Sequence, residues 1–279
     1  MRSFDIVAVA LPIDDIRDAL LRAAVPGSRI LLKAPTGSGK STSVPSFLTP
    51  KETAEITLVI EPRRMAARLL AGWVARQRGG EVGHDVGYAV RYDTRYGKNT
   101  RIIYMTDGVF QRWIQEDAQL RGVGTVIFDE FHERRLAVDV ALARCLDLQE
   151  GQRPDLRVVV MSATLETAGL ADYLGPQTVM LETGGRTHPV GIQYRPEKPA
   201  AASRTGAPPR ETPLWERIAS VVREAIASPE PGHILVFCPG TYEIRKTCEL
   251  LENASFARGW NVFPLYSSLP PRAQEMAIE

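Results

Sequence analysis

The sequence has little of what builds small cross-linked or zinc-bound domains. It contains three cysteines in 279 residues, and no two of them have the CxxC spacing of zinc ligands. So few cysteines exclude a disulfide framework, and we expect Cys145, Cys238 and Cys248 to be reduced core thiols. An excess of one charge is also missing, because 34 Lys and Arg balance 33 Asp and Glu to a formal net charge of +1. Any site for a polyanion must therefore be local.

Long apolar runs are absent as well. No stretch has 18 consecutive apolar residues, so no transmembrane helix and no membrane partner are expected. The N-terminal stretch MRSFDIVAVALPIDD has Asp5 before its first apolar run, which is unlike a secretory signal peptide. These two absences predict a cytoplasmic protein. The sequence indicates no oligomeric state.

Short β-rich runs that alternate with helical patterns are what the chain does contain, and they are typical of βαβ units and a parallel sheet. The predicted strands are continuously apolar, as in a sheet covered on both faces. They span residues 29–34, 56–60, 100–105, 125–129 and 157–161. The helical patterns span residues 13–23, 64–77, 107–115 and 136–148. We therefore predict an α/β fold with a parallel sheet flanked by helices.

The alternation is interrupted once. Residues 195–213, RPEKPAAASRTGAPPRETP, are rich in Pro, Ala and charge without apolar periodicity, and they predict a flexible insertion or linker. Beyond it, helices and strands are predicted in alternation over residues 214–226, 233–238, 241–254 and 261–266. This pattern indicates a second α/β domain, so we predict a first domain over 1–187 and the N-terminal part of a second over 188–279.

The strongest chemical signal is KAPTGSGKST, residues 33–42, which lies between a predicted strand and a predicted helix as a P-loop does. Its glycines let backbone amides turn toward phosphate oxygens, and Lys40 can reach the β- and γ-phosphates. The strict GxxxxGK[ST] pattern has Gly where this chain has Ala34, and a Gly/Ser turn capping a helix is the structural alternative. The predicted nucleotide-binding residues are Thr36, Gly37, Ser38, Gly39, Lys40, Ser41 and Thr42.

An acidic pair, Asp129 and Glu130, follows the apolar run TVIF and begins the stretch DEFHER. Charges at the end of a buried strand need compensation. Beside a P-loop, Asp129 and Glu130 would form a metal site with the Ser41 hydroxyl for hydrated Mg²⁺, and Glu130 would deprotonate the attacking water. The structural alternative is an ion-pair cluster with Arg134 and Arg135.

Together with MSATL, residues 161–165, these stretches resemble the helicases of superfamily 2 and, within them, the DEAH/DExH RNA helicase branch. The spelling DEFHER resembles the bacterial HrpB type of that branch. The resemblance implies a P-loop RecA-like first domain and the start of a second, with ATP and Mg²⁺ as cofactors. It also implies an ATP-dependent RNA helicase that contacts the backbone of single-stranded RNA. Such an enzyme couples ATP hydrolysis to strand unwinding or to remodelling of RNA–protein complexes.

The family motifs can be carried onto this sequence residue by residue. Motifs Ia, Ib, III and IV match residues 61–68, 106–110, 162–164 and 234–244, and GRTHPV at 185–190 resembles the passage between the two domains. In the family, His132 of motif II couples the nucleotide site to motif III, so it joins Lys40 and Glu130 as a predicted catalytic residue. Ser162 and Thr164 would link hydrolysis to movement between the domains. The spacing of His132 gives no HExxH, which excludes a zinc protease.

Candidate nucleic-acid contacts follow two of the predicted strands. Arg63 and Arg64 follow one strand, and Thr106 and Asp107 follow another, where α/β sheets bind ligands. Guanidinium groups suit phosphate oxygens, although two arginines can also simply solvate a helix start. RYDTRYGKNTR, residues 91–101, interleaves basic and aromatic residues as stacking surfaces do. A solvated turn between two strands is the favoured interpretation of that stretch.

Trp73 lies in the predicted helix after motif Ia, near where the family carries an arginine that stacks on the nucleotide base. An indole could stack on a base in the same way, and we include Trp73 among the nucleotide-binding residues. The structural alternative is a core tryptophan.

Motifs V and VI of the family do not occur before residue 279. Motif VI supplies arginine fingers, which are worth about 10³–10⁵ in rate in P-loop enzymes. We therefore expect a fragment that binds ATP and Mg²⁺ and hydrolyses ATP slowly. Two rival classes are a nucleotide-switched RNA-binding protein without unwinding activity and a P-loop kinase or transporter ATPase.

Overall fold

The computed structural model of the chain describes residues 11–164, 168–185, 190–195, 212–229 and 232–278. The chain divides into two compact units, Met1–Pro189 and Val190–Glu279. The predicted insertion at 195–213 lies outside the described residues except at its two ends. Among the described helices, none is long and apolar enough to cross a membrane.

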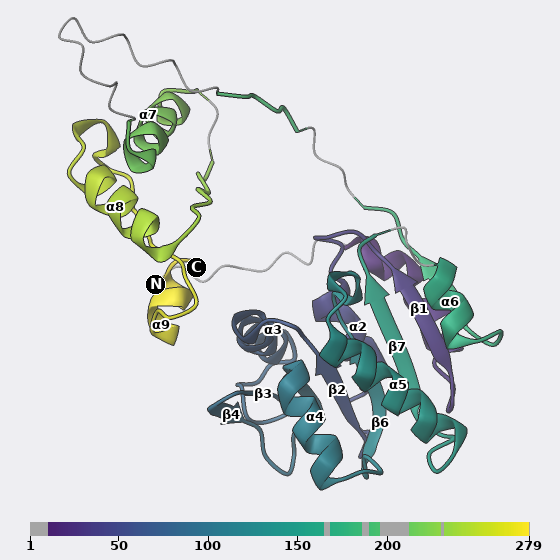
Figure 1. Cartoon of the computed structure of the whole chain (residues 1–279). Helices are drawn as coiled ribbons and strands as arrows, with labels where there is room; N and C mark the ends of the chain where they lie inside the picture. The colour runs from purple at the N-terminus through teal and green to yellow at the C-terminus, as the bar shows by residue number, and fades with distance from the viewer. Residues whose placement is uncertain (1–10, 165–167, 186–189, 196–211, 230–231, 279) are drawn as a thin grey trace, which may run out of the picture. The chain divides into compact units, whose positions relative to one another are not determined.

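The first unit is built on an eight-stranded sheet with the order β4-β3-β5-β2-β6-β7-β1-β8 (Figure 1). Neighbouring strands are parallel except β3 and β4, which form an antiparallel hairpin. The strands are β1 (Arg29–Lys33), β2 (Ile56–Ile60), β3 (Val86–Val90), β4 (Asp93–Arg95), β5 (Ile102–Met105), β6 (Val123–Phe128), β7 (Arg157–Ser162) and β8 (Val179–Glu182). Because β6 and β7 lie between β1 and β2, the segments that follow these strands become neighbours along the carboxyl ends of the strands, although they are far apart in the sequence.

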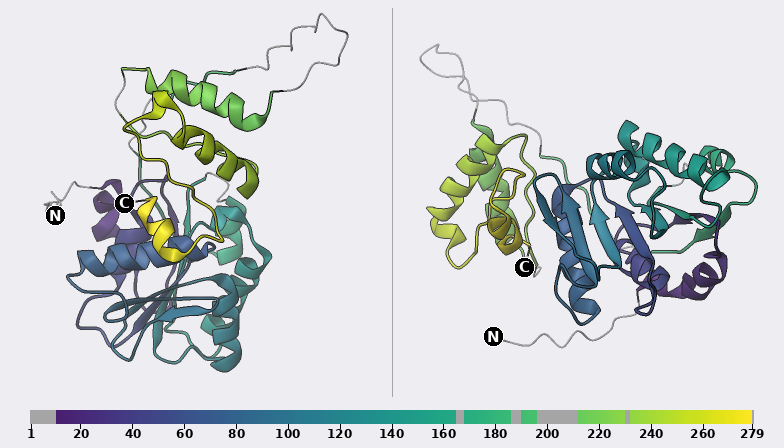
Figure 2. Two further views of the ribbon diagram at one scale, coloured as in Figure 1. Left: turned by 90° about the vertical axis from the view of Figure 1, so that its left-hand side faces the viewer. Right: turned by 90° about the horizontal axis from the view of Figure 1, so that it is seen from below.

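Helices cover both faces of this sheet (Figure 2). One face packs against η1 (Pro12–Ile16), α1 (Arg17–Ala23), α2 (Lys40–Leu48) and α3 (Arg64–Gln77). The other packs against α4 (Asp107–Glu116), α5 (Leu136–Glu150) and α6 (Ala168–Leu174). Successive residues of a strand enter opposite cores, as when Ile30 and Leu32 face one helical layer and Leu31 the other. Burial on both faces accounts for the continuous apolar runs of the strands.

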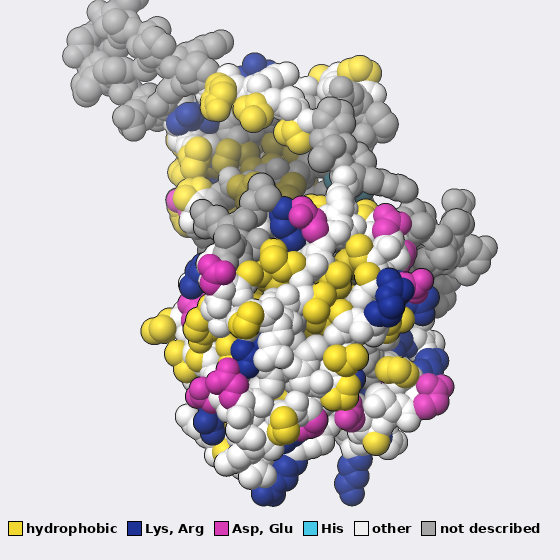
Figure 3. Space-filling model, turned by 90° about the vertical axis from the view of Figure 1, so that its right-hand side faces the viewer, with side chains coloured by type: hydrophobic (Ala, Val, Ile, Leu, Met, Phe, Trp, Pro, Cys, Tyr) yellow, Lys and Arg dark blue, Asp and Glu magenta, His cyan; other side chains and the backbone are white. Residues whose placement is uncertain are grey.

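All five strands predicted in this unit form, with ends shifted by at most two residues. The predicted helix over 13–23 forms as η1 followed by α1. Strands β3, β4 and β8 were not predicted. β8 is an edge strand whose Val179 and Met180 are exposed, so it lacks the signature of a buried strand. The face of the unit at the β8 edge mixes acidic, basic and apolar side chains, in keeping with the balanced net charge (Figure 3).

The second unit contains α7 (Leu214–Ile226), α8 (Thr241–Glu252), η3 (Ser255–Ala257) and α9 (Pro271–Met276). Its core is small, with Ala219, Val222 and Leu251 as the buried members of the cluster between α7 and α8. The three cysteines of the chain are free thiols, of which Cys145 in the first unit is fully buried and the other two are half-buried.

The strands predicted over 233–238 and 261–266 are wrong for the part of the second unit that the structure describes. Both segments run between helices without pairing to another strand, and a strand needs a partner for its backbone N–H and C=O groups. Their apolar pattern remains, because Ile234 and Val236 pack on the small core while Leu235 and Phe237 are 72% and 88% exposed.

Candidate nucleotide and nucleic-acid site

The predicted site segments meet at one edge of the sheet. Because β1, β2, β5, β6 and β7 are parallel, their carboxyl ends share that edge, where open α/β sheets bind ligands. The P-loop follows β1, motif Ia follows β2 and motif Ib follows β5. The DEFHER stretch follows β6, and the SAT stretch begins at the end of β7.

The P-loop joins β1 to α2, and Lys40 is the first residue of that helix. Gly37 and Gly39 have φ angles of 78° and 90°, in the left-handed region that favours glycine. A Cβ added at Gly39 would also lie 2.6 Å from Cδ1 of Leu11. Ala34, the departure from the strict pattern, is fully buried in the core on the α2 side of the sheet. The alanine therefore packs into the core.

The remaining predicted residues of the loop differ in exposure. Thr36 is exposed, and the Thr42 hydroxyl donates to the Gly39 carbonyl at 3.0 Å. The Ser38 hydroxyl is buried and has no hydrogen-bond partner among the described residues. Ser41 is fixed through its backbone, because its carbonyl accepts a hydrogen bond of 2.7 Å from the buried Tyr104 hydroxyl.

Lys40 and Glu130 form an ion pair in the site, with 2.8 Å between Nζ and Oε1. The Lys40 side chain is only 4% exposed, so this pair is shielded from solvent on one side. Glu130 has a φ of 47°, which is uncommon for a residue other than glycine. Such strain clusters at functional sites, where surrounding contacts hold the backbone.

Arg134 and Arg135 do not pair with Asp129 or Glu130. Arg134 lies 3.4 Å from Asp139, and Arg135 lies 3.3 Å from Asp107 and donates to the Pro62 carbonyl at 2.5 Å. The interpretation of the acidic pair as a cluster with these two arginines is therefore wrong.

Asp129 is a buried carboxylate with one oxygen free. It is 1% exposed, its Oδ1 accepts the Glu130 N–H at 2.9 Å, and its Oδ2 has no hydrogen-bond partner among the described residues. Burial raises the pKa of Asp129 to about 6, against the lowering effect of a hydrogen bond from the Ser41 hydroxyl.

Mg²⁺ fits this arrangement. An orphaned carboxylate oxygen beside a hydroxyl is a set of hard oxygen donors of the kind that Mg²⁺ prefers. Within the described ranges, no group of three His, Cys, Asp or Glu side chains is arranged to hold a metal. A sparse protein shell suits Mg²⁺, which keeps several waters and takes substrate phosphates as ligands.

His132 connects the acidic pair to the end of β7. Its Nδ1 lies 3.3 Å from Oε2 of Glu130 and 3.4 Å from the backbone nitrogen of Ala163. A neutral imidazole can accept the Ala163 N–H at this atom, whereas a protonated one can donate to Glu130. Ser162 is buried and its hydroxyl accepts the Thr164 N–H at 3.4 Å, while the Thr164 side chain is exposed.

The four predicted nucleic-acid residues lie at the same edge but differ in accessibility. Arg63 is 71% exposed and pairs with Glu133 at 2.5 Å. The Arg64 guanidinium donates to the carbonyl of Arg91 at 2.9 Å. Thr106 and Asp107 are largely buried at the start of α4. The Thr106 N–H already donates to the Ala89 carbonyl at 3.3 Å, so the Asp107 amide is the better placed of the two for a phosphate.

The basic and aromatic stretch at 91–101 begins as the turn between β3 and β4. At this turn Tyr92 has a φ of 68° and is 87% exposed, and the Arg91 guanidinium lies 4.8 Å from the centre of its ring. Arg64 binds the Arg91 carbonyl, so the turn is attached to motif Ia.

Trp73 is 42% exposed on α3, so its alternative interpretation as a core tryptophan is wrong. An exposed indole leaves base stacking open as a prediction.

Glu61 is a candidate site residue that the sequence reasoning missed. It follows β2, is 3% exposed, and its Oε1 accepts the Arg63 N–H at 3.2 Å. Burial is the main cause that raises its pKa to about 8, and the nearby Asp129 carboxylate adds to the effect. The signal was available, because Glu61 follows the apolar run ITLVI as Asp129 follows TVIF.

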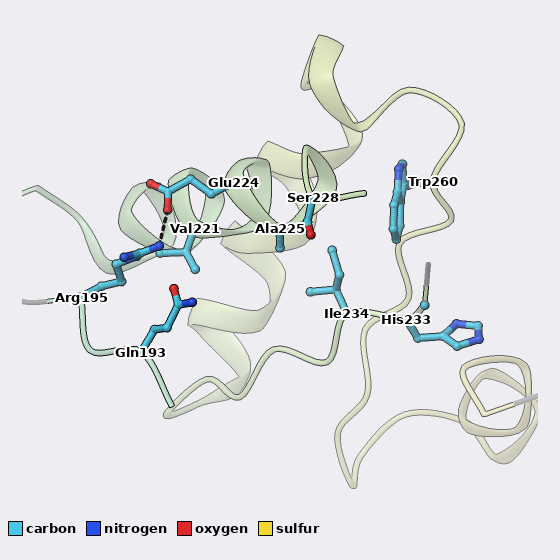
Figure 4. Close-up of a pocket in the computed structure, with 10 residues that line it drawn as sticks. Gln193, Arg195, Val221, Glu224, Ala225, Ser228, His233, Ile234 and Trp260 are labelled. Atoms are coloured by element: carbon cyan, nitrogen blue, oxygen red, sulfur yellow. Dashed lines mark ion pairs between the residues drawn. The ribbon is translucent and has the colours of Figure 1, made fainter. Parts of the chain in front are cut away.

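A separate groove of about 420 Å³ lies in the second unit (Figure 4). The ion pair of Arg195 and Glu224, 2.9 Å long, lies at one end, and His233 and Trp260 lie at the other. None of the predicted site residues lines it.

A phosphate-binding loop on a parallel sheet, with an acidic pair from a nearby strand, defines the class of P-loop nucleotide-binding proteins. The DEAD/DEAH box helicase family matches residues 14–172, which is more than half of the chain. The chain belongs to this family, and its eight-stranded sheet has the RecA-like helicase architecture.

Relatives support the same assignment. The chain is 39% identical over 276 residues to the ATP-dependent RNA helicase HrpB of Escherichia coli (strain K12), covering 96% of this chain and 32% of HrpB. It is 32% identical over 268 residues to the ATP-dependent RNA helicase HrpA of Borreliella burgdorferi, covering 95% of this chain and 31% of HrpA. The crystal structure of the Escherichia coli DEAH/RHA helicase HrpB matches with a TM-score of 0.80 and 38% identity, and the match covers 96% of this chain and 33% of that one. The chain thus spans about a third of the length of these relatives, and the resemblance to the HrpB type is confirmed.

Proposed function

We propose that this chain is the ATP-binding part of an ATP-dependent RNA helicase that couples ATP hydrolysis to RNA unwinding or to remodelling of RNA–protein complexes. The observation that carries the proposal is the Lys40–Glu130 ion pair beside a buried Asp129 with one free carboxylate oxygen. The matched relatives are named ATP-dependent RNA helicases, which supports RNA as the nucleic acid.

In this proposal the P-loop amides and Lys40 bind the phosphates of ATP. Mg²⁺, when bound, would neutralise the charge that develops on the β- and γ-phosphate oxygens. The Ser41 hydroxyl and the Asp129 carboxylate would hold the ion, with Glu130 reaching it or its waters. A phosphate that draws Lys40 away would release Glu130, whose carboxylate then orients the attacking water and accepts its proton.

His132 would couple a change in the contacts of Glu130 to motif III. Its Nδ1 is within reach of both Glu130 and the Ala163 backbone, so a change at the carboxylate alters which hydrogen bond the imidazole makes. Ser162 and Thr164 flank Ala163 and would pass that change to the second domain.

RNA would bind along the edge formed by motifs Ia and Ib. Arg63 and Arg64 would supply guanidinium groups for backbone phosphates, and the start of α4 would supply the Asp107 amide. The exposed Tyr92 beside Arg91 would offer a face on which an unpaired base can stack.

We also propose that residues 1–187 form the first RecA-like domain and residues 188–279 the N-terminal part of a second. The division of the chain into compact units between Pro189 and Val190 supports this boundary.

The test combines nucleotide binding with single-turnover ATP hydrolysis, measured with and without single-stranded RNA. Lys40→Ala is expected to lose ATP binding. Glu130→Gln is expected to keep ATP affinity within a few-fold and to slow hydrolysis by about 10²–10⁴, as loss of a general base does. Glu116→Gln, an acid-to-amide change on the exposed face of α4, is the matched control.

Wild-type hydrolysis in Glu130→Gln would show that the assigned base is wrong. ATP-dependent RNA affinity without strand separation of a duplex substrate would instead favour a nucleotide-switched RNA-binding protein.

A further inference from the structure

Residues 182–185 run beside the entry to the P-loop. β8 is parallel to β1, and the pairing continues beyond both strands, because the Thr183 N–H donates to the Lys33 carbonyl at 3.1 Å. Lys33 forms an ion pair with Glu182, and the Thr183 hydroxyl donates to the Pro12 carbonyl at 2.7 Å. The chain that leaves β8 is therefore fixed against the segment that begins the phosphate-binding loop.

Gly185 lies directly against the ring of Pro35. A Cβ added at Gly185 would overlap Cγ of Pro35 and lie 3.1 Å from its Cβ, whereas one added at the adjacent Gly184 would meet nothing within 4 Å. Gly185 is absent from the glycines with positive φ, so its conformation does not require glycine. Glycine is therefore required at position 185 only because a larger residue would not fit beside Pro35.

Pro35 can transmit a displacement to the phosphate-binding amides. Its ring fixes φ and cannot turn aside as a flexible side chain would. Its carbonyl accepts the Ser38 N–H at 3.2 Å, which closes the turn that contains Thr36 and Gly37. A shift of Pro35 would therefore move the amides that precede Lys40.

We propose that Gly185 is a positioning residue for the nucleotide phosphates, acting through Pro35. Because Gly185 has no side chain, the chain after β8 can pack closely against Pro35. This packing holds the P-loop amides where they can bind the phosphates. This inference rests on the proposed nucleotide-binding function of the loop. It adds a residue from the segment that leads out of the first unit, far in sequence from the P-loop itself.

The experiment measures the Kd of a fluorescent ATP analogue with Mg²⁺ for the whole chain and five variants: Gly185→Ala, Gly184→Ala, Pro35→Ala, the double variant Pro35→Ala/Gly185→Ala, and Lys40→Ala. Gly185→Ala is expected to bind about tenfold more weakly, the size of a typical overpacking penalty. Gly184→Ala is expected to bind within about twofold of wild type, because its added methyl meets open space.

The double variant distinguishes positioning from general damage. Removing Cγ of Pro35 relieves the overlap, so Gly185→Ala should weaken binding by no more than about twofold in the Pro35→Ala background. Thermal unfolding of each variant shows whether it is folded, and the comparison within the Pro35→Ala background is decisive if Gly185→Ala alone is unstable.

Two outcomes separate this inference from the function on which it rests. If wild type binds the analogue, Lys40→Ala does not and Gly185→Ala binds as wild type, the role of Gly185 is overturned and nucleotide binding stands. An equal loss from Gly185→Ala in both backgrounds also overturns it. If wild type itself does not bind the analogue, the proposed function fails.

Discussion

The acidic pair at the end of β6 lies against residues of the P-loop and does not pair with Arg134 or Arg135. Glu130 pairs with Lys40, and the Ser41 hydroxyl lowers the pKa of Asp129 against the effect of burial. One Asp129 oxygen still lacks a partner among the described residues. A protein that leaves a buried carboxylate oxygen unpaired forgoes stability there, as sites prepared for a cation do.

Glu61 yields a prediction for the pH dependence of stability. Burial and Asp129 raise its pKa from an ordinary 4.5 to about 8. Because the folded pKa exceeds the unfolded one, the folded state binds the proton more tightly. The resulting stabilisation is complete below about pH 4.5 and is lost as the pH rises through about 8. Between these values the free energy of unfolding of wild type should fall more steeply than that of Glu61→Gln, by up to about 1.4 kcal/mol per pH unit.

Urea unfolding at several pH values between 5 and 8, roughly the window of the shifted pKa, measures this difference. The groups that face Glu61 are the carboxylates of Asp129, Glu130 and Glu133, all of which raise its pKa, and the Arg63 N–H, which lowers it. Glu116→Gln on α4 is the control and should keep the wild-type slope. Parallel curves for wild type and Glu61→Gln would contradict a buried, protonated Glu61.

At the scale of elements, the start of α2 depends on a glycine for two reasons. Gly39 has a φ of 90° and also faces Leu11, whereas Gly79, after α3, has a φ of 79° and open space around its Cα. Gly79→Ala should therefore lose about 1 kcal/mol of stability from backbone strain alone. Gly39→Ala should lose about 1–3 kcal/mol more from the clash with Leu11 and should displace Lys40.

Thermal unfolding and ATP affinity distinguish the two glycine variants. Gly79→Ala should bind ATP as wild type does, and Gly39→Ala should bind much more weakly and unfold at a lower temperature. Equal melting temperatures for the two variants would show that Leu11 does not pack against the loop as described.

At the scale of the whole molecule, the two units differ greatly in their cores. The first has two extensive apolar clusters, one on each face of the sheet, and the second has a small cluster whose buried members are Ala219, Val222 and Leu251. Amides in regions with few buried apolar contacts exchange through low-energy openings. Backbone amides of α7 and α8 should therefore exchange much faster than those of β1, β6 and β7.

Hydrogen exchange followed by mass spectrometry measures this contrast directly. Addition of ATP and Mg²⁺ should slow exchange in the P-loop and after β6 in the first unit, because binding stabilises the folded state there. Equal protection of the two units in the nucleotide-free chain would contradict the difference in their cores.

Much of the first unit could be predicted from local patterns. The helix over 64–77 forms at the predicted residues, as does that over 214–226 in the second unit, and the five central strands form within two residues of their predicted ends. The periodicity of apolar residues and the residue preferences of turns extend over only a few residues, so both can be recognised in the sequence. The P-loop and DEFHER are contiguous stretches, and each indicates its chemistry for the same reason.

The tertiary structure alone decided which distant groups meet. The sequence by itself determined the α/β class, the phosphate-binding loop and the acidic pair. It did not determine that Glu130 pairs with Lys40, that Glu61 is buried beside Asp129, or that Gly185 packs on Pro35. It also failed over 233–238, where an apolar run has no strand beside it. Strand pairing, burial and charge compensation depend on neighbours that only the folded chain supplies.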